Sequence, residues 1–159
     1  MWPYRAVKIL LYILFTIGLI IIIGGIVLAV QSHHTPVLGL VKGQLRPCPN
    51  SPNCVSSETP IGDAEHSIAP FPIRTNQPLQ HLAAAINQLG GTVIINDGHY
   101  LRATFTSRLF RYVDDVEAQV DAAHKQINWR SASRVGRSDL GVNRKRIEAL
   151  RQRMQRQSN

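Results

Sequence analysis

The chain has 159 residues and a formal charge of +8, from 18 Lys and Arg against 10 Asp and Glu. The residues beyond an apolar N-terminal run amount to about one domain, enough to build a single hydrophobic core. Most of the excess charge lies near the C-terminus, where residues 130–159 hold nine Lys and Arg against Asp139 and Glu148. A field of this sign attracts anions such as lipid headgroups, acidic envelope polymers or nucleic acid.

The first predicted element is the apolar run at residues 9–30, which has 22 positions and no charged side chain. A hydrocarbon core of about 30 Å needs about 20 helical residues, because a helix rises about 1.5 Å per residue. The alternative is a cleaved signal peptide, since Val27 and Ala29 fit a signal-peptidase site. The apolar region of a signal peptide is typically only about 7–15 residues long, so we predict a retained transmembrane helix.

Charge on the two sides of this run predicts its orientation. Arg5 and Lys8 precede it, whereas the first basic residue after it is Lys42. Basic residues favour the cytoplasmic side, so residues 1–8 are expected in the cytoplasm and the rest of the chain outside. We predict a single-pass membrane protein, most simply in a bacterial inner membrane with its domain facing the periplasm. This location argues against nucleic acid as a partner.

The part of the chain after the predicted helix divides into three. Residues 31–46 have little periodicity and contain proline and glycine, so they are predicted as a stalk. An extracytoplasmic domain is expected at residues 47–156, and a polar tail at residues 157–159.

Cys48 and Cys54 are the only two cysteines, and an even pair in an oxidising compartment most simply forms one disulfide. Five residues separate them, which excludes a CxxC redox motif. The nearby Asp63, Glu65 and His66 do not reproduce a zinc spacing. We predict a structural disulfide with no metal and no cofactor; a redox or metal role is the alternative.

Two amphipathic helices are predicted on either side of a run of strands. In residues 76–89 apolar side chains recur at spacings of three and four, Thr75 or Asn76 can cap the start, and a glycine pair ends the helix. The second helix, at about residues 143–155, has a narrow apolar stripe flanked by arginines. We expect this stripe to pack on the sheet, and the alternative is a helix that lies on the membrane surface.

Between these helices the apolar period changes to two, which predicts strands. Asp97-Gly98 is typical of a hairpin turn. The third and fourth strands, at residues 110–120 and 127–135, pair in a register in which the numbers of facing residues sum to 247. The predicted fold class is α+β, with an N-terminal transmembrane helix followed by a small domain. That domain has an antiparallel β-meander of about four strands and two packing helices.

This register places Asp114 on the core-facing row of its strand, among Phe110, Tyr112 and Val116. A buried carboxylate is costly unless it is hydrogen-bonded or neutralised. Its predicted partner is the hydroxyl group of Ser133, which faces it on the next strand, or an arginine.

On the opposite face Glu117 lies across from Arg130, and Asp115 lies close to Arg134, so opposite charges are matched. We interpret Asp114, Asp115 and Glu117 as a structural polar network, with a catalytic role as the alternative. Adjacent strand residues point to opposite faces, so the two aspartates cannot form one carboxylate dyad. No catalytic residue is therefore predicted.

Three segments carry a resemblance to a known family: CPNSPNCVSS at residues 48–57, RLFRYVDDVE at 108–117 and RSASRVGRSDLGVNRKRIEALR at 130–151. They resemble the signature segments of the family known as domain of unknown function 1499, and the similarity covers roughly residues 43–154. The resemblance implies a small bacterial or plastid domain, often behind a membrane anchor. It implies no activity.

The link between the fourth strand and the last helix is rich in hydroxyl and guanidinium groups. A helix start beside arginines offers free backbone amides and bidentate donors to an anion. The predicted ligand-binding residues are Arg130, Ser131, Ser133, Arg134, Asp139, Asn143 and Arg144. An equally weighted alternative is a turn in which Asp139 and Asn143 cap the helix.

Three function classes follow from these features. The first is a binding or interaction module at the outer membrane face, for an acidic ligand or envelope partner: anionic lipid, an envelope polymer or a protein. The second is a structural subunit of a membrane or envelope complex. The third is an enzyme that uses Asp114, and it ranks last because the chain has no GxSxG, P-loop, HExxH or dinucleotide fingerprint.

Overall fold

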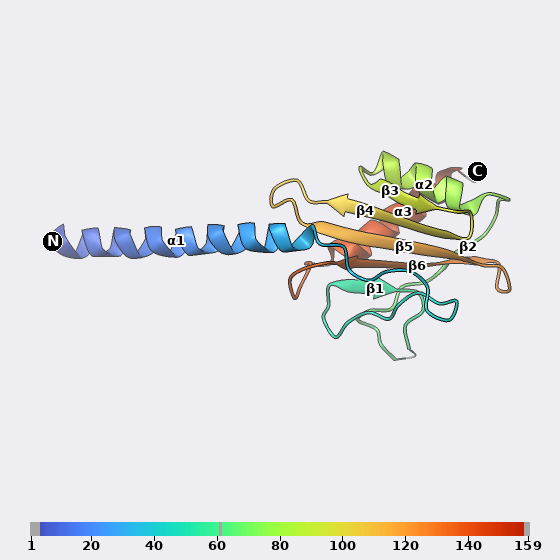
Figure 1. Ribbon diagram of the computed structural model, residues 1–159, viewed down its shortest axis with the longest axis horizontal. Helices are drawn as coiled ribbons and strands as arrows, with labels where there is room; N and C mark the ends of the chain where they lie inside the picture. Colours follow the sequence, from blue (N-terminus) through green and yellow to red (C-terminus); the bar gives the residue numbers. More distant parts are fainter. Residues whose placement is uncertain (1–3, 61, 158–159) are drawn as a thin grey trace.

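The computed structural model describes residues 4–60 and 62–157 (Figure 1). Part of the predicted cytoplasmic N-terminus and most of the predicted polar tail lie outside these ranges. Nine elements follow in chain order: α1 (Tyr4–Ser32), β1 (Cys54–Ser56), β2 (Phe71–Pro72), α2 (Pro78–Gln88), β3 (Thr92–Asn96), β4 (Tyr100–Thr106), β5 (Val113–Asp121), β6 (Gln126–Ser133) and α3 (Val142–Gln157).

Helix α1 projects from one end of the domain, and most of its large apolar side chains are exposed (Figure 1). Its 29 residues contain the whole apolar run and have a length of about 43 Å. Among the described residues it is the one helix that is long and apolar enough to cross a membrane. A single N-terminal helix of this kind is a candidate membrane anchor.

The domain is built on an antiparallel sheet in the order β1-β6-β5-β4-β3, and β2 also pairs with β6. Strands β3 to β6 form the predicted meander, and the Asp97 carboxylate accepts backbone hydrogen bonds from His99 and Tyr100 at the first turn. The α+β class is thus confirmed. The sheet has six strands rather than about four, because two short segments before α2 also pair with β6.

The predicted register of β5 with β6 is confirmed, since Asp114 faces Ser133 and Glu117 faces Arg130. The strand bounds differ, because β5 begins at Val113 rather than at residue 110. The prediction that Phe110 lies on the core-facing row is therefore wrong. Phe110 lies in the loop before β5, where its side chain is 54% exposed.

Helices α2 and α3 cover one face of the sheet, as their apolar periodicity predicts. The shared core contains fully buried side chains from both helices and from the central strands, namely Leu79, Leu82, Ile86, Leu101, Val116, Ala118, Ile127, Trp129, Ile147 and Leu150. The stripe of α3 therefore packs on the sheet rather than on a membrane surface.

The ends of α2 follow local chemistry. Its N-cap residue is Gln77, without a side-chain capping hydrogen bond, so the predicted cap at Thr75 or Asn76 is wrong. The glycine pair does end the helix, because Gly90 adopts a φ of +82°. A Cβ atom at Gly91 would lie only 2.6 Å from the Phe105 ring, so this position needs glycine for a close approach.

Candidate functional site

Asp115 and Glu117 of β5 and Arg130 of β6 alternate with core residues and so lie on the sheet face opposite the helices, here called the outer face. Arg134 donates two hydrogen bonds of 2.7 Å to the two carboxylate oxygens of Asp115. Arg130 donates one of 3.2 Å to Glu117. Both carboxylates are buried, at 2% and 0% exposure. The opposite-charge matching expected from the register is confirmed.

The outer face is covered by the stretch that the sequence predicts as a stalk. The backbone amide of Gly39 donates to Glu117 at 2.8 Å, and the amide of Leu45, itself buried, donates to Glu58 at 2.6 Å. Tyr100 also donates to Glu117, at 2.6 Å. Burial, followed by this hydrogen bond, raises the pKa of Tyr100 above its usual range. Glu117 is thereby bonded by Arg130, a phenol and a backbone amide.

Arg134 also joins the domain to α1. Its Nη1 atom donates to the backbone carbonyl of Ser32 at 3.1 Å, and the Ser32 hydroxyl accepts a hydrogen bond of 3.2 Å from the amide of Val113. The last carbonyl groups of a helix have no partner within the helix, and its C-terminal end carries partial negative charge. The Arg134 guanidinium group donates to one of these carbonyl groups and offsets the partial negative charge. Helix α1 is therefore held at its end by Val113, the first residue of β5, and by Arg134, just after β6.

Beside this joint lies a cleft of about 420 Å³. Its lining comes from three parts of the chain: residues Pro36, Val37 and Leu38; residues Arg46, Pro47, Cys48 and Pro49; and Asp115, Arg130, Ala132, Ser133 and Arg134 of the sheet and its end. We call it the arginine cleft. Three guanidinium groups and one carboxylate line it, among otherwise mostly apolar side chains.

The three arginines of the cleft differ in how many of their guanidinium nitrogens donate hydrogen bonds. Arg134 is saturated by Asp115 and the end of α1. Arg130 is bonded to Glu117 through Nη1 alone; its side chain is 10% exposed, and its buried Nε atom has no hydrogen-bond partner. The Nε atom of Arg46 is likewise buried without a partner. Unpaired guanidinium donors beside a cavity are the feature of this site that suits an anion.

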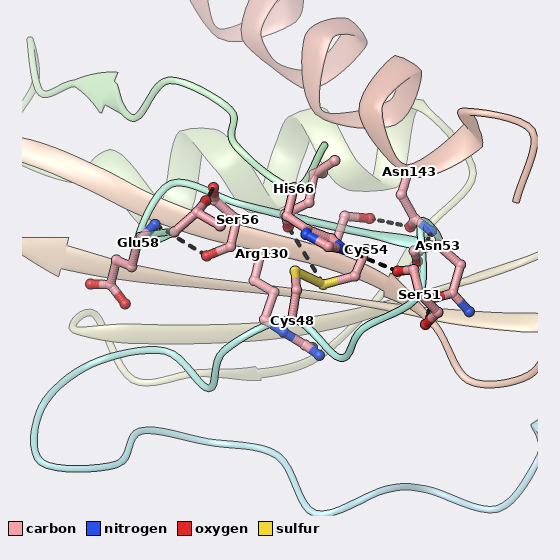
Figure 2. The surroundings of a disulfide bond; sticks show 12 residues. Cys48, Ser51, Asn53, Cys54, Ser56, Glu58, His66, Arg130 and Asn143 are labelled. Atoms are coloured by element: carbon pink, nitrogen blue, oxygen red, sulfur yellow. Dashed lines mark hydrogen bonds between the residues drawn. A yellow bond between two sulfur atoms is a disulfide. The ribbon is translucent and has the colours of Figure 1, made fainter. Parts of the chain in front are cut away.

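Cys48, which lines the cleft, is bonded to Cys54 in a disulfide that lies beside Arg130 (Figure 2), with a Cα–Cα distance of 5.7 Å. The predicted disulfide is thus present in the structure. Hydrogen bonds of Asn53 hold the loop that the disulfide closes. Asn53 donates to the carbonyl of Gly136 at 2.6 Å, and its own carbonyl accepts from the side chain of Asn143 at 2.9 Å.

His66 fastens the same loop from the other side. Its Nδ1 atom lies 2.7 Å from a carboxylate oxygen of Asp63, and its Nε2 atom lies 3.2 Å from the carbonyl oxygen of Ser51. Both ring nitrogens face acceptors, which favours the doubly protonated ring. The hydrogen bond to Asp63, opposed by burial, raises the pKa of His66, and the same bond lowers the pKa of Asp63.

On the core side, three of the predicted ligand residues form a closed network. Asn143 is fully buried, accepts from Ser131 at 2.6 Å and donates to Ser133 at 3.0 Å. Arg146 donates to Ser131 at 3.0 Å, to the Asn143 oxygen, and to Asp114 at 2.6 Å. The partner of Asp114 is therefore Arg146 and not the hydroxyl of Ser133. The predicted register could not identify it, because α3 brings Arg146 to the sheet.

The remaining predicted ligand residues serve the start of α3 and its packing. Asp139 accepts from the backbone amides of Gly141 at 3.0 Å and Asn143 at 2.7 Å, which is a capping role. Arg144 donates to the backbone carbonyls of Ser67 at 2.8 Å and Glu65 at 2.9 Å. Arg130, Ser133 and Arg134 are the predicted ligand residues that line the arginine cleft.

Sequence reasoning missed Arg46 as a residue of this site. The signal available was weak: one basic residue two positions before the first cysteine of the disulfide. Its place in the cleft follows from the path of residues 33–46 over the outer face, and nothing in the local pattern predicts that path.

Two other features bear on catalysis. Asp114 and Asp115 lie on opposite faces of the sheet, each bonded to a different arginine, so they do not act as one acid–base pair. Within residues 4–60 and 62–157, no group of three or more His, Cys, Asp or Glu side chains is placed to hold a metal ion.

A larger cleft of about 650 Å³ lies around the β5–β6 turn, but its polar groups are largely paired. Glu58 accepts from Gln119 and Asn128, both at 2.8 Å, and Asp121 lies 2.7 Å from the ring of His124. We therefore take the arginine cleft, with its unpaired guanidinium donors, as the candidate binding site in preference to this larger cleft.

Comparison with known proteins gives one match. Residues 44–154 match the family described as "protein of unknown function (DUF1499)". No curated protein and no solved structure matches the chain.

Proposed function

The chain belongs to the DUF1499 family, and we propose that it is a membrane-anchored module that binds a small acidic ligand in the arginine cleft. The observation that carries this proposal is the Arg46 guanidinium group, which lines a cavity of about 420 Å³ and has no acceptor among the described residues, next to the partly paired guanidinium group of Arg130. An anionic ligand in the cleft would supply acceptors to the terminal nitrogens of these two arginines, whose Nε atoms are covered by protein.

The proposed ligand combines a carboxylate or phosphate group with a small apolar part. The acidic group would meet Arg130 and Arg46, whereas Val37, Leu38 and Ala132 of the cleft suit an apolar portion. Asp115 is neutralised by Arg134 and Glu117 by Arg130, so Arg46 is the guanidinium group of the cleft whose charge has no carboxylate partner among the described residues.

The proposal includes the location of the domain. In it α1 crosses the membrane with residues 1–8 in the cytoplasm, and the domain lies outside, in the periplasm if the cell is a Gram-negative bacterium. The exposed apolar surface of α1 supports the span. Two observations support the orientation: the basic residues Arg5 and Lys8, which precede the apolar run, and the disulfide, which persists in an oxidising compartment.

The binding test uses the full chain in detergent, with butyl phosphate as probe and butylammonium as the oppositely charged control. Butyl phosphate should raise the midpoint of thermal unfolding, because a ligand at ten times its Kd stabilises the folded state by about 1.4 kcal/mol. Butylammonium should not. Equal shifts with both probes would contradict an anion site.

Arg46→Gln is the informative variant, since Arg46 forms no ion pair with any described residue, unlike Arg130. Loss of one charged hydrogen bond of about 1.5–3 kcal/mol should weaken butyl phosphate binding at least about tenfold. Arg74→Gln removes an exposed arginine outside the cleft and is the matched control. Unchanged binding by Arg46→Gln would remove the proposed site.

A structural subunit of an envelope complex is the second candidate. The observation in its favour is the rigid joint between α1 and the domain at Ser32, Val113 and Arg134, because a fixed helix is suited to packing against other membrane helices. Cross-linking in intact membranes, followed by purification through the full chain, tests it. A defined partner obtained without any probe binding would favour the subunit.

A further inference from the structure

We propose that two loops next to α1 dock the domain onto the lipid bilayer in which α1 is anchored. They are the β4–β5 loop, residues 107–112, and the β6–α3 loop, residues 134–141. Figure 1 shows both at the end of the domain from which α1 emerges, one on each side of the helix. The inference rests on the proposed membrane span of α1 and does not require the arginine cleft.

Both loops expose large apolar side chains. In the first loop Leu109 is 80% exposed and Phe110 54% exposed, and in the second Leu140 is 85% exposed. Leu140 also adopts a φ of +54°, a backbone conformation that is unfavourable for leucine. Apolar side chains at such tips are disfavoured in water and become favourable in contact with lipid.

The first loop reaches along the side of α1. Leu109 and Phe110 line an apolar groove of about 380 Å³ together with Ile22, Ile26 and Ala29 of the helix. A Cβ atom placed at Gly25 would lie 3.9 Å from the ring of Phe110 and 3.7 Å from the hydroxyl of Tyr112. The loop tip is therefore level with Gly25 and not with the end of the helix.

The second loop lies beside α1 about one turn closer to the C-terminal end of the helix than the first loop. Leu28 of the helix lines a cavity of about 160 Å³ with Val135, Gly136 and Asp139 of the loop and Val142 of α3. The two loops thus contact the same last turns of α1.

The position of these contacts along α1 indicates that the loops meet lipid. Gly25 is five residues before Val30, the last residue of the apolar run, which at about 1.5 Å per residue is a depth of about 7 Å. The run of 22 residues is about as long as the hydrocarbon core is thick, so Val30 lies near its boundary. A side chain level with Gly25 must then lie in the outer leaflet. If α1 spans the bilayer, Phe110 contacts lipid.

The charges on the loops fit the same occupant. Arg108 and Arg111 flank the apolar tip of the first loop, and Arg137 lies in the second; all three are exposed. The first loop has no acidic residue, and the one carboxylate of the second, Asp139, caps α3. Arginines around an apolar tip match phosphate headgroups around a hydrocarbon interior.

The test places one spin label at a time on the full chain in bilayer discs of phosphatidylcholine with phosphatidylglycerol. Leu109→Cys and Leu140→Cys report the two tips, Ala123→Cys in the β5–β6 turn is the water-exposed control, and Ile20→Cys reports α1. The native cysteines are bonded to each other, so the added thiol is the one that reacts. Labels at both tips should collide more with oxygen, and less with a water-soluble nickel chelate, than the label at position 123.

Each result has a clear meaning. If the label at position 20 lies in lipid but either tip is as open to the nickel chelate as position 123, two-point docking is wrong and the anchor stands. If position 20 is open to water, the proposed span fails first. A tip shielded from both oxygen and nickel is covered by protein, which also overturns lipid docking.

The arginines are tested by the triple variant Arg108→Gln, Arg111→Gln and Arg137→Gln. With anionic lipid present, it should increase nickel access at position 109, and in pure phosphatidylcholine the difference from the parent should shrink. Unchanged access in anionic discs would contradict headgroup binding by these arginines.

Discussion

Replacing Arg146 with methionine should strongly destabilise the domain, because Arg146 neutralises the carboxylate of Asp114. The two side chains are 10% and 13% exposed, so the pair is close to a buried one, for which removal of one partner costs about 3–5 kcal/mol. The other acceptors of Arg146 suffer less, since Ser131 and Asn143 remain bonded to each other at 2.6 Å. The cost therefore comes chiefly from one uncompensated carboxylate, and we expect about 3 kcal/mol.

The assay is urea unfolding of the full chain in detergent, followed by tryptophan fluorescence, since Trp129 lies in the core. Asp114→Asn combined with Arg146→Met removes both charges, so the double variant should recover more than half of the loss. Arg153→Met is the control on the same helix, because its recorded hydrogen bond is a single contact of 3.3 Å to Gln88. A loss below about 1 kcal/mol for Arg146→Met, the range of exposed pairs, would refute the burial argument.

Three further predictions concern other joints of the fold. The ring closed by Cys48 and Cys54 has a sequence separation of only 6, so replacing both with serine should cost about 2 kcal/mol, measured by urea unfolding. The ion pair of His66 and Asp63 should stabilise most between their ordinary pKa values of about 3.8 and 6.5. Stability should fall as pH rises through the raised pKa of His66, and as pH falls through the lowered pKa of Asp63; thermal unfolding of His66→Gln from pH 5 to 8.5 should lack the alkaline decline. Arg134→Gln should speed amide hydrogen exchange in the last turn of α1, and unchanged exchange would contradict its role as a joint.

Local pattern accounts for most of the fold. The apolar run, the spacing of Leu79, Leu82 and Ile86, and the alternation along β5 and β6 each depend on neighbours a few residues apart, so periodicity predicts them. Strands β1 and β2 escaped prediction because they are three and two residues long and have no period to read. Their strand character comes from pairing with β6.

The candidate site was predictable only in part. Arg130 and Arg134 were found because cross-strand register pairs them with carboxylates, which is a local rule. Arg46 was missed because it lies 84 and 88 positions before Arg130 and Arg134, so only tertiary packing brings them together. Asn143 and Ser131 were expected in an anion pocket, but they lie in a closed network under α3. That network also depends on the packing of α3 against the sheet.

Local sequence pattern is enough to predict an apolar N-terminal helix, an oxidisable cysteine pair, the register of the central strands and the basic character of the C-terminal end. These are properties of residues close together in the chain. Three other features come from tertiary packing: residues 33–46 cover the outer face, Arg134 holds the end of α1, and Arg146 neutralises Asp114. Each of these depends on contacts between distant segments, which arise when the sheet and its helices pack and not before.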